Sequence, residues 1–234
     1  MIFQEIDFLR FFSIFIGQGV LALIFLLIAI RILGRNRSRL SLIISSFYIL
    51  ESIAFVLNII YFPIKINPLA SILYLATIYL ISFAPILLVL FSITLYRSEK
   101  AVKSKAYQKY IIMYGIVLFI LLIIPGSFEF GENTGWRPQL SWFLLIGLYS
   151  LVTIGVLIPM IKLMKRISAH FNDKKLRKKW NYFQYGFYGI AISYYGLVLY
   201  STWRNPIFQI IYPIFTILLI PAGYLLYLGL GKKI

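Results

Sequence analysis

Glu51 is the residue of this sequence whose chemistry most needs an explanation. It stands in the apolar stretch FYILESIAF, residues 47 to 55, with no basic residue near it in sequence. A charged side chain at the centre of a membrane costs roughly 2.5–3.5 kcal/mol on insertion scales, so such residues are functional candidates by default. We therefore expect Glu51 to be uncharged or to face a wet cavity.

Three further polar residues belong to the same candidate site. Tyr48 lies about one helical turn before Glu51, and Asn58 lies two turns after it on the same face. Gln18 is the other strongly polar side chain at depth, in the preceding apolar stretch. Two interpretations stay open: these groups hydrogen-bond neighbouring helices and hold them in register, or they line a ligand pocket, a proton-linked switch or a transport path.

A group of tyrosines between residues 182 and 200 forms a second candidate site. Tyr185, Tyr188 and Tyr195 fall near one face of the expected helix, where they would line a pocket for an apolar or aromatic ligand. The alternative is packing with a satisfied hydroxyl, which is the commoner use of buried tyrosine.

The composition shows what kind of element must position these residues. Of the 234 residues, 61% are hydrophobic and 13% are charged, whereas soluble domains are roughly 45–50% apolar and about 25% charged. A soluble fold of this size could not bury so much apolar surface. We predict an all-α, polytopic membrane protein, with residues 1–234 forming a single bundle of seven transmembrane helices. A membrane helix needs about 20 mostly apolar residues, and the expected helices span residues 11–33, 40–62, 69–95, 109–125, 141–164, 182–202 and 206–229.

Lys and Arg are distributed unevenly over the predicted loops. Nineteen of the 23 lie in or beside the connections after the first, third and fifth helices and in the C-terminal tail. The other four are Arg10, Lys65, Arg137 and Arg204. Because cytoplasmic loops carry the excess of Lys and Arg, we expect a multi-pass cell-membrane protein with its N-terminus outside and its C-terminus in the cytoplasm.

Two of the predicted loops have a possible binding role. The loop after the fifth helix contains a basic cluster that would contact anionic lipids of the inner leaflet or dock an acidic cytoplasmic partner: Lys174, Lys175, Arg177, Lys178 and Lys179. The outer loop GSFEFGENTGWRPQL, residues 126–140, is rich in turn residues and is the natural lid over a ligand. The plainer interpretations are a topology signal for the first loop and a connector for the second.

Several function classes lack the residues they would need. The chain has no cysteine and one histidine, His170, in a charged loop, so thiolate metal sites and disulfides are excluded. Phosphate-binding glycine loops, paired catalytic carboxylates and nucleophile–base arrangements are also missing from the sequence. We therefore expect neither an enzyme nor a protein with a metal or cofactor. In a membrane protein the net charge of +16 indicates lipid contact and topology rather than nucleic-acid binding.

The layout resembles the seven-helix sensor region at the N-terminus of some membrane histidine kinases. The first helix ends in a basic cluster, RILGRNRSRL, and the fifth ends in a basic connector that re-enters the membrane, KLMKRISAHFNDKKLRKKWNYFQYGFYGIAISYYG. No kinase domain follows GLGKKI in this sequence. The resemblance therefore implies either a sensor whose signal passes to a separate protein or a chain whose role has changed.

Three functions follow as alternatives. The first is a non-enzymatic sensor or receptor, whose ligand enters between helices or beneath the 126–140 loop and whose basic inner loops couple to a cytoplasmic partner. The second is a small transporter or channel with a path near Glu51. The third is a membrane subunit of a larger complex. A sensor should have an outward pocket in a closed bundle, whereas a transporter should have broken helices and a central cavity that reaches Glu51.

Overall fold

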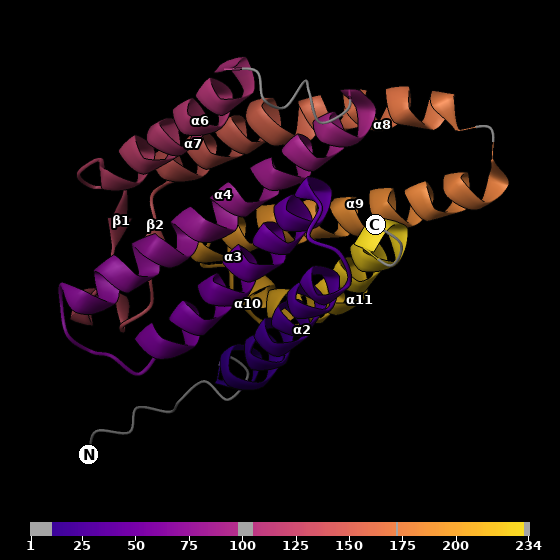
Figure 1. Cartoon of the computed structure of the whole chain (residues 1–234). Helices are drawn as coiled ribbons and strands as arrows, with labels where there is room; N and C mark the ends of the chain where they lie inside the picture. The colour runs from indigo at the N-terminus through magenta and orange to yellow at the C-terminus, as the bar shows by residue number, and fades with distance from the viewer. Residues whose placement is uncertain (1–10, 98–104, 172, 232–234) are drawn as a thin grey trace.

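The computed structural model describes residues 11–97, 105–171 and 173–231, and helices form almost all of this structure (Figure 1). The α-helices are α2 (Gly19–Arg35), α3 (Arg39–Tyr61), α4 (Leu69–Arg97), α6 (Lys105–Ile123), α7 (Trp142–Val152), α8 (Ile158–His170), α9 (Lys174–Thr202), α10 (Pro206–Phe215) and α11 (Leu219–Leu226). Shorter segments of π-helix, η1 (Phe12–Gln18), η3 (Thr153–Leu157) and η5 (Tyr227–Gly231), and of 3-10 helix, η2 (Glu132–Thr134) and η4 (Thr216–Leu218), adjoin or link them. The predicted all-α class is confirmed.

Short polar side chains mark where several helices begin. The Ser38 hydroxyl accepts the backbone N–H of Ser41 at 3.2 Å before α3, and the Asp173 carboxylate accepts that of Lys175 at 2.7 Å before α9. Such N-caps satisfy amide groups that a helix leaves without an internal partner and are each worth about 1 kcal/mol. The boundaries of these helices thus follow from local sequence as well as from the apolar stretches between them.

The membrane character of the protein is shown by the length and composition of its helices. Within the described part of the chain, four helices are long and apolar enough to cross a membrane. They are Phe12–Arg35, Arg39–Tyr61, Leu69–Tyr96 and Trp142–His170. Many large apolar side chains on them are exposed, among them Leu23, Leu27 and Ile154 at more than 60%, which fits a surface that faces lipid rather than water.

The other three predicted membrane helices are present as helices, but they are not both long and apolar enough to be counted among these four. The apolar part of α6 is the shorter stretch Tyr107–Ile123. In α9, which has 29 residues, a basic first turn and many tyrosines and glycines lower the hydropathy. The last helix is interrupted by η4 between α10 and α11. The prediction of seven membrane helices was based on the length of the apolar stretches alone. It therefore did not detect these differences in polarity and continuity.

Three connections meet at one end of the bundle, which we call the hairpin end. β1 (Phe128–Glu129) and β2 (Gln139–Leu140) pair here as a small antiparallel hairpin. The Asn67 side-chain amide donates to the carbonyl oxygen of Phe130 at 2.7 Å. The Arg204 guanidinium donates to the carbonyl oxygens of Thr134 and Arg137 at 3.5 and 3.4 Å. Long-range hydrogen bonds therefore join the α3–α4 connection, the hairpin and the α9–α10 connection.

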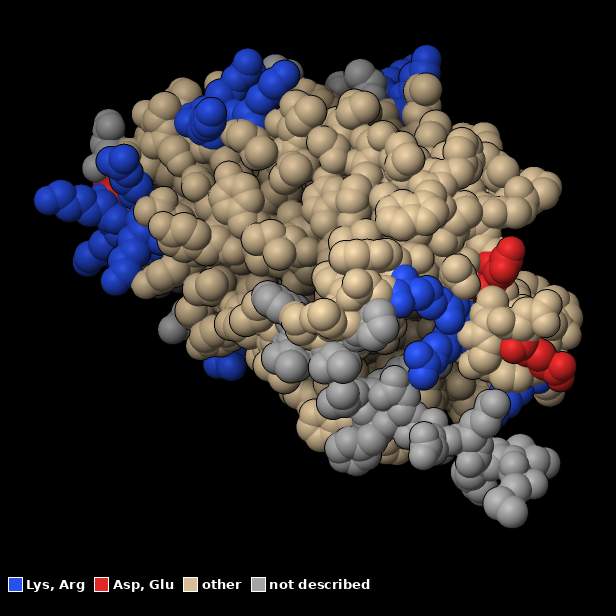
Figure 2. All heavy atoms as spheres, turned by 180° about the vertical axis from the view of Figure 1, so that it is seen from behind, with Lys and Arg blue, Asp and Glu red and all other residues tan. Residues whose placement is uncertain are grey.

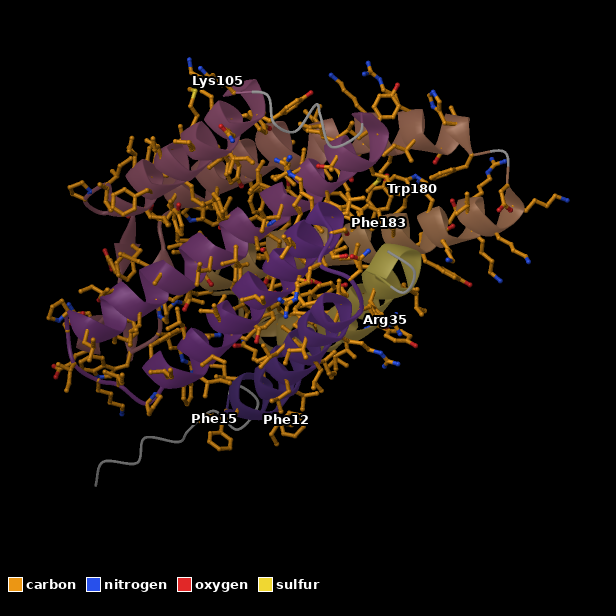
Figure 3. All side chains as sticks on the ribbon, viewed as in Figure 1. Phe12, Phe15, Arg35, Lys105, Trp180 and Phe183 are labelled. Atoms are coloured by element: carbon orange, nitrogen blue, oxygen red, sulfur yellow. The ribbon has the colours of Figure 1, made fainter. Side chains whose placement is uncertain are left out.

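The opposite end, which we call the basic end, holds the last turn of α2, the end of α4 and the α8–α9 turn. The rings of Tyr96 and His170 contact each other there, with centroids 5.5 Å apart. Arg35 and Trp180 lie toward this end, whereas Phe12 lies at the far end of the first membrane helix (Figure 3).

Close contact between helices characterises the packing near the basic end. A side-chain carbon added to Gly186 of α9 would lie 2.6 Å from the carbonyl oxygen of Ala222 and from the backbone nitrogen of Leu226 in α11. One added to Gly223 would overlap the ring of Phe25 in α2. Small residues let membrane helices approach closely enough for their backbones to touch. The last helix therefore packs tightly between α9 and α2.

Candidate functional site

The main candidate site is a cavity of about 90 Å³ that enters the bundle at the hairpin end. Its walls come from η1 and the start of α2, the second half of α3, the first half of α4, the end of α9, and α10 with the segment that follows it. Its lining residues are Ser13, Ile14, Gln18, Leu21, Phe55, Asn58, Tyr61, Tyr74, Thr77, Ile78, Ile81, Arg137, Pro138, Leu197, Tyr200, Ser201, Arg204, Gln209, Tyr212, Thr216 and Leu219. By comparison, a cavity of about 150 Å³ is large enough to bind benzene.

Two irregular helical segments border this cavity. Ser13, Ile14 and Gln18 come from the π-helix η1, and Thr216 comes from the 3-10 segment η4. π-helical turns are rare and are frequent at functional sites, and a 3-10 stretch within a helix often marks a hinge. The regular backbone of the first and of the last helix is therefore interrupted beside the cavity.

Gln18 and Asn58 form a polar pair in the cavity wall. Both side chains are more than 90% buried, and the Asn58 amide nitrogen donates to the side-chain oxygen of Gln18. The other polar atom of Asn58, its side-chain oxygen, is buried and has no hydrogen-bond partner among the residues that the structure describes. A buried acceptor without a partner costs about 1–3 kcal/mol, so this oxygen needs a donor from water or from a ligand.

Two arginines from separate connections also line the cavity. Arg137 follows the 3-10 segment of the hairpin, and Arg204 lies between α9 and α10. The hydrogen bonds of Arg204 to two hairpin carbonyls bring the two residues together. A small group of Lys and Arg side chains stands beside a hollow at this end of the molecule, far from the larger groups at the opposite end (Figure 2).

Glu51 does not belong to this cavity. Its side chain is buried, with 5% of its surface exposed, and it is not among the lining residues. Asn58 lies seven residues further along α3, which is about 10 Å. Tyr48 donates from its hydroxyl to the carbonyl oxygen of Gly223 at 2.8 Å. The candidate site is thus divided: Gln18 and Asn58 face the cavity, whereas Glu51 and Tyr48 lie in the packed part of the bundle.

The tyrosines expected to line a pocket do not line this one. Tyr185 and Tyr188 are exposed, at 63% and 37%, because their face of α9 turns outward. Tyr195 is half-buried, and its hydroxyl shares a 2.5 Å hydrogen bond with that of Thr153 in η3. Tyr195 therefore joins α9 to η3 and does not line this cavity.

The basic cluster lies at the basic end, on the first turns of α9. The side chains of Lys174, Lys175, Arg177 and Lys178 are exposed and that of Lys179 is half-buried. Lys178 reaches back over the ring of Tyr182, with its amine 5.9 Å from the ring centre. The cluster is accessible to lipid headgroups or to a partner.

Sequence reasoning missed most of the cavity wall. Tyr200, Gln209 and Tyr212 approach it from α9 and α10. Arg137 and Arg204 were noted only for their contribution to the charge distribution. The sequence could have pointed to them as site residues, because they are two of only four basic residues on the predicted outer face.

Comparisons with known proteins give this chain no relative from which a role could be transferred. No family model matches the sequence, and neither a curated protein nor a solved structure matches the chain. The functional argument therefore depends on the geometry of the cavity and of the two ends of the bundle.

Proposed function

We infer that the protein is a membrane-embedded, non-enzymatic sensor that receives a small ligand in the cavity at the hairpin end. The observation that carries this proposal is the position of the cavity. It is framed by irregular segments of the first and last helices, and Glu51 lies outside its lining. A pocket at one end of a closed bundle favours a sensor that binds a ligand over a transporter that moves a substrate through the bundle.

The proposal includes seven membrane crossings, with the N-terminus outside and the C-terminus in the cytoplasm. Two features support this topology. The connections predicted to be outside meet at the hairpin end through the bonds of Asn67 and Arg204. The exposed cluster from Lys174 to Lys178 lies at the other end, and basic loops favour the cytoplasmic side. The ligand would then reach the cavity from the outside.

The last helix gives this cavity a physical link to the basic end. Gln209 and Tyr212 stand in the cavity wall near its start. Further along, Gly223 packs against Phe25, and its carbonyl accepts the hydroxyl of Tyr48. A ligand that shifts α10 would thus shift the packing beside the basic end. We propose that a cytoplasmic partner reads this change through the basic loops.

Cysteine labelling tests the proposal, since the chain has no cysteine of its own. Three single variants are labelled in intact cells and after permeabilisation, with a maleimide that cannot cross membranes: Ser201→Cys in the cavity, Lys178→Cys at the basic end and Glu51→Cys in the packed bundle. We expect Ser201→Cys to react in intact cells, Lys178→Cys only after permeabilisation, and Glu51→Cys in neither state. An unreactive Ser201→Cys in folded protein would remove the outward cavity, and Lys178→Cys reacting in intact cells would reverse the topology.

A transporter is the second candidate, because the interruption of the last helix at η4 lies beside the cavity. Broken helices at a central site are typical of secondary transporters. The same labelling separates the two functions. Transport predicts that Glu51→Cys reacts with the reagent, since the path would have to continue past Asn58 toward the basic end.

A further inference from the structure

The cavity contains one buried polar group that is only half used. Asn58 lines the cavity and is 9% exposed, and its side-chain nitrogen donates to Gln18. Its side-chain oxygen has no hydrogen-bond partner among the described residues. Leaving a buried acceptor unsatisfied is destabilising. The site therefore favours an occupant that donates a hydrogen bond to this oxygen.

The helices around this oxygen present apolar side chains to the cavity. Leu21 and Phe55 lie about one helical turn farther from the hairpin end than Gln18 and Asn58 do. Both are buried, as is Ile81 of α4, which also lines the cavity. The described lining residues that lie on helices are all uncharged, whereas the two arginines lie in connections at the hairpin end. A charged group beside Asn58 would lose its water without gaining an opposite charge from these helices, so the donor belongs to an uncharged group.

Water alone does not match the walls of this cavity. A water molecule occupies roughly 10–15 Å³ of such space and needs 2–4 polar partners, whereas the cavity measures about 90 Å³. Waters beside Leu21, Phe55 and Ile78 would find no hydrogen bonds in those side chains. An amide N–H would bring a carbonyl that also needs a partner. A hydroxyl on a short apolar body satisfies Asn58 and covers the apolar wall at the same time.

We propose that the cavity binds a small uncharged alcohol, whose hydroxyl donates to the side-chain oxygen of Asn58 and whose aliphatic body lies against Leu21, Phe55 and Ile81. This proposal rests on the function inferred above and names its ligand class. The volume of about 90 Å³ limits the enclosed part to about four or five non-hydrogen atoms, since about 150 Å³ holds the six of benzene. The alcohol is either dissolved in the aqueous phase or the hydroxyl end of an uncharged lipid.

The test measures binding of two isomeric probes to the purified full chain in nanodiscs of deuterated phosphatidylcholine, by saturation-transfer NMR. 1-Butanol donates a hydrogen bond, whereas methyl propyl ether has the same atoms and no donor. The quantity compared is the ratio of the two dissociation constants. We expect 1-butanol to bind about tenfold more tightly than the ether, since only the alcohol satisfies the buried acceptor. Equal binding of the two probes would overturn the proposal.

Variants show whether the preference for the alcohol comes from Asn58. Asn58→Leu should reduce the ratio about tenfold. The double variant Gln18→Leu/Asn58→Leu should do the same without leaving an unpaired buried amide, because both partners are replaced together. Ser52→Ala is the matched control, since Ser52 also joins α3 to α2, through the Ala22 carbonyl at 2.9 Å, but does not line the cavity. It should leave the ratio unchanged, and thermal melting of each variant checks that the fold is kept.

Dioleoylglycerol added to the nanodiscs distinguishes the source of the alcohol. If a lipid hydroxyl occupies the site, this lipid will displace 1-butanol and trioleoylglycerol, which has no hydroxyl, will not. If the ligand is a soluble alcohol, neither lipid will change the binding of 1-butanol.

The proposal is overturned if neither probe binds, or if both leucine variants keep the ratio of the original chain. Such a result with Ser201→Cys still reactive from outside would leave the sensor proposal standing, whereas an unreactive Ser201→Cys would remove both.

Discussion

The two halves of α3 illustrate two uses of polar side chains in one membrane bundle. Toward the basic end, Tyr48 and Ser52 donate to backbone carbonyls of neighbouring helices at 2.8 and 2.9 Å. Toward the hairpin end, Asn58 pairs with Gln18 and faces a cavity, and its side-chain oxygen has no hydrogen-bond partner in the described part of the chain. Satisfied polar groups hold helices together, whereas an incompletely satisfied group beside open space is available for a ligand.

The same contrast appears in the packing of the last helix. In its first part, Gln209 and Tyr212 border the cavity, although the Tyr212 ring also packs closely against Gly196 of α9. Further along, Gly223 touches the Phe25 ring. Added volume should therefore be costly in one region and tolerated in the other. Four substitutions test this contrast, beginning with the one that should have the largest effect.

Gly186→Leu should cause the largest loss of stability. The first added carbon already meets backbone atoms of α11 at 2.6 Å, and backbone cannot move aside as a flexible side chain can. We expect a cost at or above the roughly 3 kcal/mol upper range for overpacking, or a fall of about 6–12 °C in melting temperature. Tryptophan fluorescence during heating in detergent measures it.

Gly34→Ala is the control for that substitution, because nothing lies within 4 Å of a carbon added there. An equal fall in melting temperature for Gly34→Ala and Gly186→Leu would show that replacing a helical glycine is itself destabilising here. The contact between Gly186 and α11 would then not be the cause. The contrast between the tight and open regions would then lose its support.

Glu51→Lys should have the next largest effect. The side chain at this position is 5% exposed, and a lysine at the centre of a membrane helix costs roughly 2.5–3.5 kcal/mol. The yield of membrane-inserted protein and its melting temperature should both fall. Glu51→Gln should keep both near those of the original protein, since a neutral amide resembles a protonated carboxyl. Unchanged yield and melting for the lysine variant would mean that Glu51 faces water and that the packed half of α3 is not closed.

Tyr48→Phe should cost less, about 0.6 kcal/mol, which is the average for a hydrogen bond between membrane helices. The change removes only the hydroxyl that binds the Gly223 carbonyl and leaves the buried ring in place. Repeated melting curves against Ser46→Ala would measure the difference, because the Ser46 hydroxyl donates to the Leu42 carbonyl of its own helix. Equal stability of the two variants would remove Tyr48 as a tie between α3 and the last helix.

Ser201→Leu should have the smallest effect on stability, within about 0.5 kcal/mol, because the larger side chain extends into the cavity that Ser201 lines. A fall in melting temperature as large as that of Gly186→Leu would show that the hairpin end is packed as tightly as the rest.

Much of the architecture follows from local sequence, because apolar length and helix-capping residues act over short distances. The helix Arg39–Tyr61 begins after Ser38 and matches the predicted stretch 40–62 closely. The predicted stretch 182–202 begins late, since the helix starts at Lys174: the basic turns are helical although they are not apolar. Hydropathy alone therefore placed the apolar part of that helix and not its start.

Composition and apolar length are enough to predict a helical membrane protein, with basic residues concentrated in particular loops and polar residues at defined depths in the apolar stretches. Which of those polar residues share a site depends on how the helices pack. Asn58 and Glu51 lie two turns apart on one helix, yet one borders a cavity and the other is packed. That difference depends on where α9, the last helix and the hairpin meet α3. These contacts join residues far apart in the chain, and local periodicity carries no information about them.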